Sequence, residues 1–372
     1  MNRNSVNPHK YSPLASVIVV TWNARRYVDE CLRSLATATA RLPIEIIVVD
    51  NASSDGTPDL IEEVLPQATF IRNRENLGFA RGNNLGIARS RGRYLFLVNS
   101  DVTLAPGCVE KLIAVMEADP KIGLLGPQML APHSIDEHSI GPHLIDPHSI
   151  DPRSGEAAVA PARRSTMRFP TLWNQLCRAL GIDSIFKSRW AGGFLVPGFA
   201  HDRTREVEVL NGWFWVARRE AVEQVGPLDE QFFMYGEDID WCYRFQQSGW
   251  KRVFYAGVSA VHYGGASSAA APARFYVEMQ RANVQYWKKH HGRLARTLYQ
   301  GIAALHQALR CAGYGLLFLA RPGSPSQASH KVRRSWAALR WLFHRNPGAP
   351  PTPSCSENGR IVSGTANAST RG

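Results

Sequence analysis

The sequence predicts an α/β fold in which a mainly parallel central sheet lies between two layers of helices. The apolar run at residues 94–98 is bounded by Gly92 and by Asn99-Ser100-Asp101, and it has no polar face. Such a run suits a strand that is covered on both sides, as in a parallel sheet. Similar runs alternate with segments of helical spacing, which implies right-handed crossovers between parallel strands.

The first half of the chain reads as a series of strands and helices. We expect strands at residues 16–21, 44–49, 70–71, 94–98 and 122–125. The segments between these strands have apolar residues at helical spacing. We therefore expect helices at residues 25–35, 57–65 and 106–117, and one that opens with residues 76–86. In the second of these helices, Thr57 is the expected N-cap and Pro58 the first helical residue.

The second half begins with a different pattern and ends in helices. We expect a strand, a turn and a strand over residues 207–216, followed by a helix at 218–225. A further helix is expected to begin near Glu237 and to stop at Gly249. Two short strands at 251–256 and 258–261 precede helices at 275–291 and 294–320.

These elements divide the chain into an N-terminal tail (1–14), an α/β domain (15–270), a basic helical extension (271–345) and a disordered tail (346–372). Residues 133–152 interrupt the domain with four pentapeptides that place His133, His138, His143 and His148 five residues apart. A His tract can bind metal. However, this spacing is poor for ligands on one helix face, and the prolines prevent a regular element. We therefore favour a flexible insertion without function.

Composition indicates a globular protein of a reducing compartment. The chain has 372 residues, of which 44% are hydrophobic and 20% charged, as expected for a packed core. Its six cysteines are scattered without a CxxC pair, which argues against a disulfide scaffold or a zinc site. Residues 1–13 are polar and lack the apolar centre of a signal peptide. We therefore expect a cytoplasmic protein.

The net charge of +12 is concentrated in the C-terminal extension. Residues 271–345 contain 13 Lys/Arg and one acid, Glu278. Such a block favours contact with nucleic acid or an anionic membrane surface. Residues 294–320 include His306, Gln307 and Arg310 and make a poor spanning segment. We expect a helix in the interface of the inner leaflet and no nucleic acid, with a solvated basic surface packed on the domain as the alternative.

Polar residues at the ends of the predicted strands indicate a ligand-binding crevice. Thr21, Asp50 and Asp101 follow parallel strands, and ligands of open α/β sheets bind at the carboxyl ends of strands. Asp50 can accept a hydrogen bond from a pyrimidine N3–H. Asp101 can bind a divalent cation, Mn²⁺ or Mg²⁺, that bridges a diphosphate, or it can merely cap a helix. His262 is a plausible second ligand, or a buried hydrogen-bonded histidine.

Three acids gather at the start of the helix that begins near residue 237. The helix dipole favours ionised carboxylates there, and an ionised Asp238 can take a proton from an acceptor hydroxyl. The dipole is expected to lower the pKa of Asp238, so its position must matter more than its basicity. Asp240 and Arg244 lie four residues apart and are expected to form a structural ion pair.

The chain resembles the inverting family 2 glycosyltransferases of the GT-A fold, and in particular their rhamnosyltransferase-like branch. The resemblance spans about residues 15–290 and rests on an ordered set of stretches: SVIVVTWNARRYVDECLRSL, EIIVVDNASSDGT, ENLGFARGNNLGI, YLFLVNSDV, FMYGEDIDWCYR and VHYGGAS. It implies a nucleotide-sugar donor, a divalent cation and a single displacement at the anomeric carbon.

By matched position, Asp50 resembles the base-reading acid and Asp101 the last Asp of the metal-binding motif. Asp238 is similar to the general base, and His262 to a late metal-contacting histidine. Trp213 and Glu237 are assigned to the acceptor side. The remaining donor-side residues are Thr21, Asn23, Gly78, Arg81, Asn84 and Ser100.

The sequence departs from the family pattern in three places, one of which is the pentapeptide insertion at 133–152, where the branch usually has a compact hairpin. The metal motif supplies one acid, Asp101, and the loop at 211–213 carries a bulky Trp213 that would narrow the acceptor site. The favoured donor is dTDP-L-rhamnose, with UDP-sugars next. The favoured acceptor is a glycan or lipid-linked glycan of a cell-surface polysaccharide.

Two rival interpretations remain open at the level of sequence. One is a nucleotidyltransferase, although residues 21–24 lack the Gly-rich, basic phosphate loop of that class. The other is a non-enzymatic protein that binds membrane or nucleic acid, which leaves the acids at the strand ends unexplained.

Overall fold

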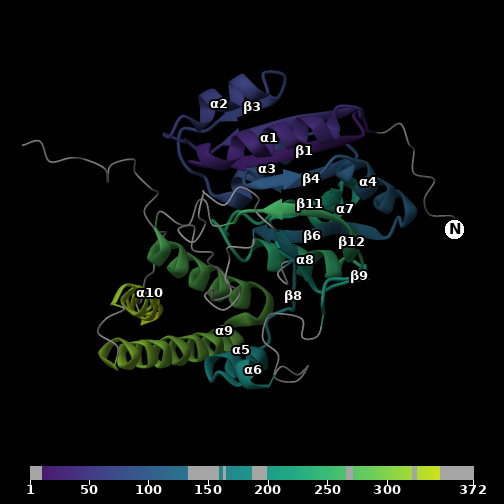
Figure 1. Cartoon of the computed structure of the whole chain (residues 1–372). Helices are drawn as coiled ribbons and strands as arrows, with labels where there is room; N and C mark the ends of the chain where they lie inside the picture. Colours follow the sequence, from purple (N-terminus) through teal and green to yellow (C-terminus); the bar gives the residue numbers. More distant parts are fainter. Residues whose placement is uncertain are drawn as a thin grey trace, which may run out of the picture.

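The computed structural model describes residues 11–132, 159–161, 165–186, 199–264, 271–320 and 325–343. The His pentapeptides at 133–152 and the C-terminal tail at 346–372 lie outside these residues, so the predictions made for them are untested. The described chain forms one central sheet with helices on both faces and a helical extension at one end (Figure 1). The predicted α/β fold class is confirmed.

The central sheet has the strand order β3-β2-β1-β4-β11-β6-β12-β5. Strands β1, β2, β3 and β4 are parallel, and β12 is parallel to β6. Only β11 and β5 run against their neighbours on this path, so the sheet is mainly parallel. The strand bounds are β1 Ala15–Thr21, β2 Ile44–Asp50, β3 Thr69–Arg72, β4 Tyr94–Asn99, β5 Val102–Leu104, β6 Ile122–Pro132, β11 Phe214–Arg218 and β12 Lys251–His262.

Short strands complete this architecture. β7 (Val159–Pro161) pairs with β6, and β9 (Arg205–Glu206) pairs with β12. β8 (Thr166–Met167) and β10 (Val209–Leu210) form a separate antiparallel pair. These pairings hold the segments between the insertion and β11 against the end of the sheet.

Two apolar layers cover the two faces of the sheet. Alternate residues of β1 divide between them, with Val17 and Val19 on one side and Ile18 on the other, as the pleat requires. Helices α1 (Arg25–Thr39), α2 (Thr57–Val64) and α4 (Cys108–Ala118) pack in the first layer. Helices α3 (Phe79–Arg89), α7 (Arg219–Val225) and α8 (Glu237–Gln247) pack in the second.

The C-terminal extension is helical, as predicted. Helix α9 (Pro272–Ala320) bends at Gly292, whose φ of 80° is not helical, so it has a first arm before this residue and a second arm after it. Helix α10 (Pro325–Phe343) packs against α9, and α5 (Leu172–Ala179), followed by the short α6 (Ile182–Ile185), also lies on α9 (Figure 1). Across the described ranges, no helix has the length and apolarity needed to cross a membrane.

Two local predictions were wrong. The N-cap of α2 is Gly56, in a left-handed conformation with φ 79°, and Thr57 is the first helical residue. Thr57 instead uses its hydroxyl to accept a hydrogen bond from the Ala24 amide, 3.1 Å away. The two short strands expected at 251–261 form one strand, β12, whose register with β6 shifts between Tyr255 and Ser259. A bulge of this kind explains why the sequence pattern is interrupted there.

Candidate active site

The carboxyl ends of three neighbouring strands bring the predicted donor residues to one edge of the sheet. Thr21 at the end of β1 is in register with Asp50 at the end of β2. On the other side of β1, Val20 is in register with Asn99, which directly precedes Ser100 and Asp101. The expected crevice edge is therefore built from β2, β1 and β4 in that order.

Asp50 presents one carboxylate oxygen that the described structure leaves without a partner. Its Oδ2 accepts a hydrogen bond from the Ser53 amide at 3.0 Å, and the residue is 2% exposed. Its Oδ1 is buried and has no hydrogen bond to the described chain, and the same is true of the Thr21 hydroxyl. Because buried polar atoms are nearly always satisfied, these two oxygens mark a place where a ligand can donate hydrogen bonds.

The turn after β2 is fixed by contacts with the turn after β1. The amide of Asn23 donates to the Ser53 hydroxyl at 2.8 Å, and the Asn23 side chain accepts from the Ser54 amide at 2.8 Å. Asn23 has a φ of 48°, a conformation that asparagine tolerates better than most residues. Asn23 thus braces the turn that orients Asp50, and its predicted contact with the donor stays a prediction.

The α3 segment plays a more structural part than predicted. Both ends of the Asn84 amide bind the 228–230 loop: its nitrogen donates to the Leu228 carbonyl at 2.8 Å, and its oxygen accepts from the Leu228 amide at 3.0 Å. Asn84 thus fixes this loop, and its predicted contact with the donor stays a prediction. Arg81 lies 3.8 Å from Glu230 of the same loop, with both side chains about half exposed.

Gly78 is a point of close approach between α3 and the loop before α8. Its φ is 83°, and a Cβ on this residue would lie 2.3 Å from the Phe233 carbonyl oxygen. The amide of the next residue, Phe79, donates to that oxygen at 2.7 Å. Only glycine fits both the conformation and the space, so Gly78 joins the start of α3 to the loop that leads to Glu237, and its predicted contact with the donor stays a prediction.

Asp101, which is buried, pairs with the partly buried His262 where β4 and β12 end. Their Oδ1 and Nε2 atoms are 3.2 Å apart, and Ser100 beside them is also buried. Burial raises the pKa of Asp101, but the attraction and hydrogen bond of His262, together with backbone amides, outweigh it and hold the pKa below its usual value. Asp101 is therefore a carboxylate at neutral pH.

This pair fits a divalent cation, although it is a minimal site. A carboxylate and an imidazole converge, and both ligand types suit Mn²⁺. The buried Nδ1 of His262 has no partner in the described chain. No group of three or more His, Cys, Asp or Glu side chains that could hold a metal occurs among the described residues. The remaining ligands of a cation here would come from phosphates and water, as is usual for Mg²⁺ at substrate sites.

Trp213 packs on His262, and its predicted place on the acceptor side, where it would narrow the site, stays a prediction. It is 3% exposed, and its ring stacks on that of His262 with centroids 5.5 Å apart and planes 19° apart. Its carbonyl accepts a hydrogen bond from the Asn99 amide at 3.0 Å. The indole thus fixes the imidazole plane, which explains why a bulky residue is accommodated there.

Asp238 lies in the first turn of α8 and is 7% exposed. Its Oδ1 accepts a hydrogen bond from the Ile239 amide at 2.8 Å. Burial raises the pKa of Asp238 to about 6, and the backbone amides at the helix start lower it only in part. The prediction of a depressed pKa was therefore wrong, because desolvation outweighs the helix dipole.

Glu237 adds a second carboxyl group at the same helix start. Its Oε2 is buried and lacks a partner in the described structure. Burial and then the charge of Asp238 raise the pKa of Glu237 well above its usual value. Two adjacent buried carboxyls whose environments favour the neutral form are typical of a site that handles protons.

Asp240 is the structural anchor of this helix, as its spacing to Arg244 predicted. Its carboxylate is fully buried and accepts from Arg244 at 2.8 Å. It also binds Lys289 at 2.6 Å and His290 at 2.7 Å from the first arm of α9. Asp240 therefore ties the C-terminal extension to the helix that carries Asp238.

A continuous chain of contacts joins the carboxyl pair to the metal pair. A Cβ on Gly212 would lie 3.5 Å from the Cβ of Asp238, and Gly212 directly precedes Trp213, which stacks on His262. His262 in turn contacts Asp101. Two neighbouring residues, Gly212 and Trp213, therefore link the predicted base to the predicted metal ligands, and a shared site stays a prediction.

Two features of this edge were not predicted. Ser53 orients Asp50 through its amide, and the DNASSDG stretch, rich in turn formers, could have indicated it. Tyr263 donates to Glu30 at 3.0 Å and stacks near Tyr27, while its amide binds the Asp101 carbonyl at 3.1 Å. No local sequence signal announces this contact between α1 and the end of β12.

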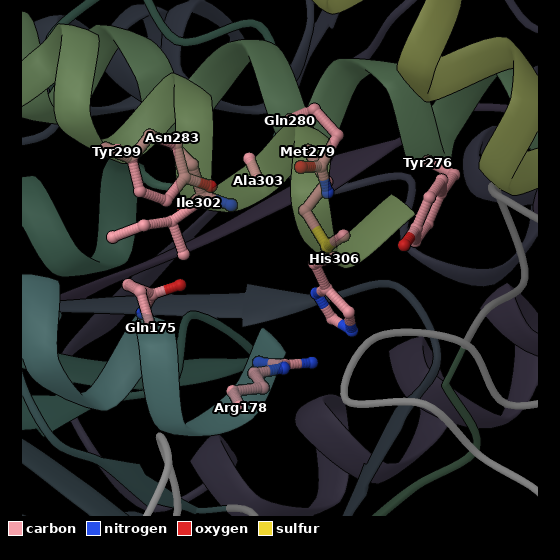
Figure 2. Close-up of a pocket in the computed structure, with 10 residues that line it drawn as sticks. All are labelled: Gln175, Arg178, Tyr276, Met279, Gln280, Asn283, Tyr299, Ile302, Ala303 and His306. Atoms are coloured by element: carbon pink, nitrogen blue, oxygen red, sulfur yellow. The ribbon is translucent and has the colours of Figure 1, made fainter. Parts of the chain in front are cut away.

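A separate pocket lies between α5 and α9 (Figure 2). Its volume of about 30 Å³ is enough for about two water molecules and too small for a sugar. Arg178 and His306 face each other across it (Figure 2), and no residue predicted for the active site lines it. The candidate active site therefore remains the edge of the sheet.

Comparisons with known proteins test the predicted enzyme class. Residues 16–155 match the family model "Glycosyl transferase family 2". An N-acetylglucosaminyl-diphospho-decaprenol L-rhamnosyltransferase of Mycobacterium tuberculosis is 26% identical over 272 residues, which are 69% of this chain and 78% of that protein. An uncharacterized glycosyltransferase of Haemophilus influenzae is 33% identical over 31% of this chain and 36% of that protein.

Among solved structures, the chain is similar to the mannosyltransferase PcManGT from Pyrobaculum calidifontis in complex with GDP-Man and Mn²⁺. The identity is 15%, the match covers 88% of both chains, and the TM-score is 0.46. A likeness of this size carries no inference about substrate or metal. The predicted enzyme class, a glycosyltransferase, is confirmed by the match of residues 16–155 to the family 2 model and by the similarity to an L-rhamnosyltransferase.

Proposed function

We propose that this chain is an inverting glycosyltransferase that moves a sugar from a nucleotide-sugar donor to a hydroxyl of a glycan acceptor. The observation that carries the proposal is the contact chain from Asp238 through Gly212, Trp213 and His262 to Asp101. It supports a single displacement in which Asp238 accepts the proton while Asp101 and His262 act on the phosphate side.

Asp238 acts as the general base. Its carboxylate removes the proton of the acceptor hydroxyl as the oxygen attacks the anomeric carbon, while the bond from that carbon to the phosphate oxygen breaks. The electron pair leaves with the nucleoside diphosphate, and the anomeric configuration inverts. With a pKa of about 6, Asp238 is mostly ionised at neutral pH yet still a useful base, which is the condition that favours general base catalysis.

Asp50, Asp101 and His262 hold the donor. The partnerless Oδ1 of Asp50 accepts a hydrogen bond from the N3–H of uracil or thymine. Asp101 and His262 would hold Mn²⁺ or Mg²⁺, which when bound neutralises charge on the departing diphosphate. Thr21 and Ser100 lie on the same edge and complete the donor side.

The favoured donor is dTDP-L-rhamnose, with UDP-sugars next, and the favoured acceptor is a lipid-linked glycan. The similar mycobacterial protein is named for transfer of L-rhamnose to an N-acetylglucosaminyl-diphospho-decaprenol, which supports both choices. We accordingly propose a role in the synthesis of a cell-surface polysaccharide, at the cytoplasmic side of the membrane.

A transfer assay with the full chain tests this proposal. The purified protein is incubated with dTDP-L-rhamnose, UDP-sugars or GDP-sugars, a polyprenyl-diphosphate-linked N-acetylglucosamine and Mn²⁺ or Mg²⁺. We expect a glycosylated lipid whose new linkage has, by NMR, the opposite anomeric configuration to the donor. Retention of configuration, or release of pyrophosphate with a nucleotide-bearing product, would refute the proposal.

A further inference from the structure

The second arm of α9 turns its leucines outward and its polar residues inward. Between residues 294 and 318, every exposed position is Leu, Ala, Gly, Phe or Thr. Leu294 is 75% exposed and Leu316 is 68% exposed. The outward positions recur every three or four residues, so they form one stripe along the helix: Leu294, Thr297, Leu298, Gly301, Leu305, Ala308, Leu309, Ala312 and Leu316.

The opposite side of the same helix faces protein and carries its hydrogen-bonding groups. Gln307 is 1% exposed and accepts from the Tyr276 hydroxyl at 3.1 Å, and Arg310 contacts the Ser335 hydroxyl of α10 at 3.4 Å. Burial, with the charges of Arg178 and Arg310, lowers the pKa of His306 to about 3, so it packs as a neutral ring. A helix in water normally orients the other way, so the stripe needs an apolar phase to cover it.

The charge of the extension distinguishes between two possible covers for the stripe, a second copy of the chain and a lipid bilayer. The extension at 271–345 has 13 Lys/Arg, and its one acid, Glu278, is 5% exposed. A second copy of the chain would bring an equally basic extension against it, which repulsion opposes. An anionic lipid surface instead offers both hydrocarbon for the leucines and negative charge for the arginines.

Helix α10 has the composition expected of an element at the level of lipid head groups. Its exposed positions alternate cations with aromatic rings, and they recur at helical spacing: His330, Arg333, Trp336, Arg340 and Phe343. Trp336 is 55% exposed and Phe343 is 72% exposed. Tryptophan favours the boundary between hydrocarbon and water, and arginine is common on the polar face of helices that lie at this boundary. Helix α10 is thus suited to meet phosphate groups beside a membrane-embedded α9 stripe.

We propose that the second arm of α9, with α10 beside it, docks on an anionic lipid bilayer, with the leucine stripe in the acyl boundary and the α10 arginines at the phosphates. The arm lies at the opposite end of the molecule from α1 and α2 (Figure 1), so those helices face away from the bilayer. This docking does not depend on the sugar or the acceptor, and it can be measured without either.

Vesicle flotation of the full chain tests the proposal. We compare vesicles of phosphatidylcholine alone with vesicles that also contain phosphatidylglycerol, at low and high salt. We expect flotation with the anionic vesicles and its reduction by salt. Leu298→Ser with Leu305→Ser should lower the partition coefficient roughly tenfold per leucine, whereas Leu298→Met with Leu305→Met should leave it unchanged.

A second set of variants tests the role of the α10 arginines against a control pair of arginines elsewhere. Arg333→Gln with Arg340→Gln should weaken binding to anionic vesicles by about a factor of five per residue, whereas Arg33→Gln with Arg41→Gln on the far side of the molecule should have no such effect. Circular dichroism and nucleoside diphosphate binding verify that each variant is folded. Equal flotation of all variants overturns the proposal. The proposal also fails if light scattering shows that the serine variant loses a dimer while its flotation is unchanged. The stripe would then be a contact between copies of the chain.

Discussion

Replacing Asp238 by asparagine is expected to make the protein more stable while it abolishes transfer. Asp238 is 7% exposed, and its pKa is raised from 3.8 to about 6. The folded state therefore holds a proton that the unfolded chain releases, so the stability contributed by this group falls as pH rises from 3.8 to about 6. At neutral pH the folded protein carries the full cost of the buried charge.

The size of this cost follows from the shift. Each unit of pKa difference corresponds to about 1.4 kcal/mol, so the charge at Asp238 lowers the free energy of unfolding at pH 7 by about 3 kcal/mol. Asparagine keeps an oxygen that can accept from the Ile239 amide and removes the charge next to Glu237. We therefore expect the variant to gain up to about 3 kcal/mol at pH 7 and little at pH 4.

Asp240→Asn on the same helix is the matched control, because the pKa of Asp240 is lowered whereas that of Asp238 is raised. Burial raises the pKa of Asp240, but hydrogen bonds and charges from His290, Arg244 and Lys289 outweigh it and lower the pKa. Removing this buried charge leaves Arg244 and Lys289 without their partner, which costs up to about 3 kcal/mol, since both cations are partly exposed to water. Denaturant unfolding at pH 4 and pH 7 measures both variants, and a transfer assay measures turnover.

The two variants should move in opposite directions. Asp238→Asn should gain stability and lose turnover by a factor of about 10²–10⁴, the usual range for a general base, while nucleoside diphosphate binding persists. A less stable Asp238→Asn protein, or one with the turnover of the natural chain, would show that the carboxyl is not a desolvated base.

Three further outcomes follow from the site. Asp101→Asn should raise the Mn²⁺ concentration needed for half-maximal transfer by roughly tenfold or more, as measured by metal titration; an unchanged titration would remove Asp101 from the metal site. Asp50→Asn should weaken binding of UDP and dTDP by about tenfold to a hundredfold, the loss of a hydrogen bond to a charged group. Calorimetry should then show less preference for these nucleotides over GDP, and a preserved preference would contradict the base-reading role. Gly78→Ala should lower the free energy of unfolding by about 2 kcal/mol or more in denaturant melts, because its φ is 83° and its Cβ would meet the Phe233 carbonyl; an unchanged midpoint would show that the loop yields.

Local pattern was sufficient to predict the sheet edge. The strands that end at Thr21, Asp50 and Asn99 are short apolar runs followed by polar residues, and parallel pairing of such strands brings their ends together. The structure has this register. The Asp240–Arg244 pair was equally accessible, because a spacing of four residues on one helix fixes the contact.

Tertiary packing determined the features of the site that the sequence did not predict. The pKa of Asp238 rises because the start of α8 is buried, with Ala282 of α9 close to Gly236, and no property of the helix alone reveals that burial. The Asn84 side chain donates a hydrogen bond to the carbonyl of Leu228, a residue 144 positions away. The stacking of Trp213 on His262 likewise joins two strand ends that are distant in sequence. A sequence pattern locates such side chains but leaves their partners undetermined.

A crystal of the full chain with Mn²⁺ and a thymidine or uridine diphosphate tests the central claim most directly. Anomalous scattering at the manganese edge locates the metal independently of any fitted ligand. We predict one strong peak in contact with Asp101 and His262, with the base at Oδ1 of Asp50 and the diphosphate on the side of Asp238. A metal peak elsewhere, with Asp101 and His262 still bound to each other, would contradict the account.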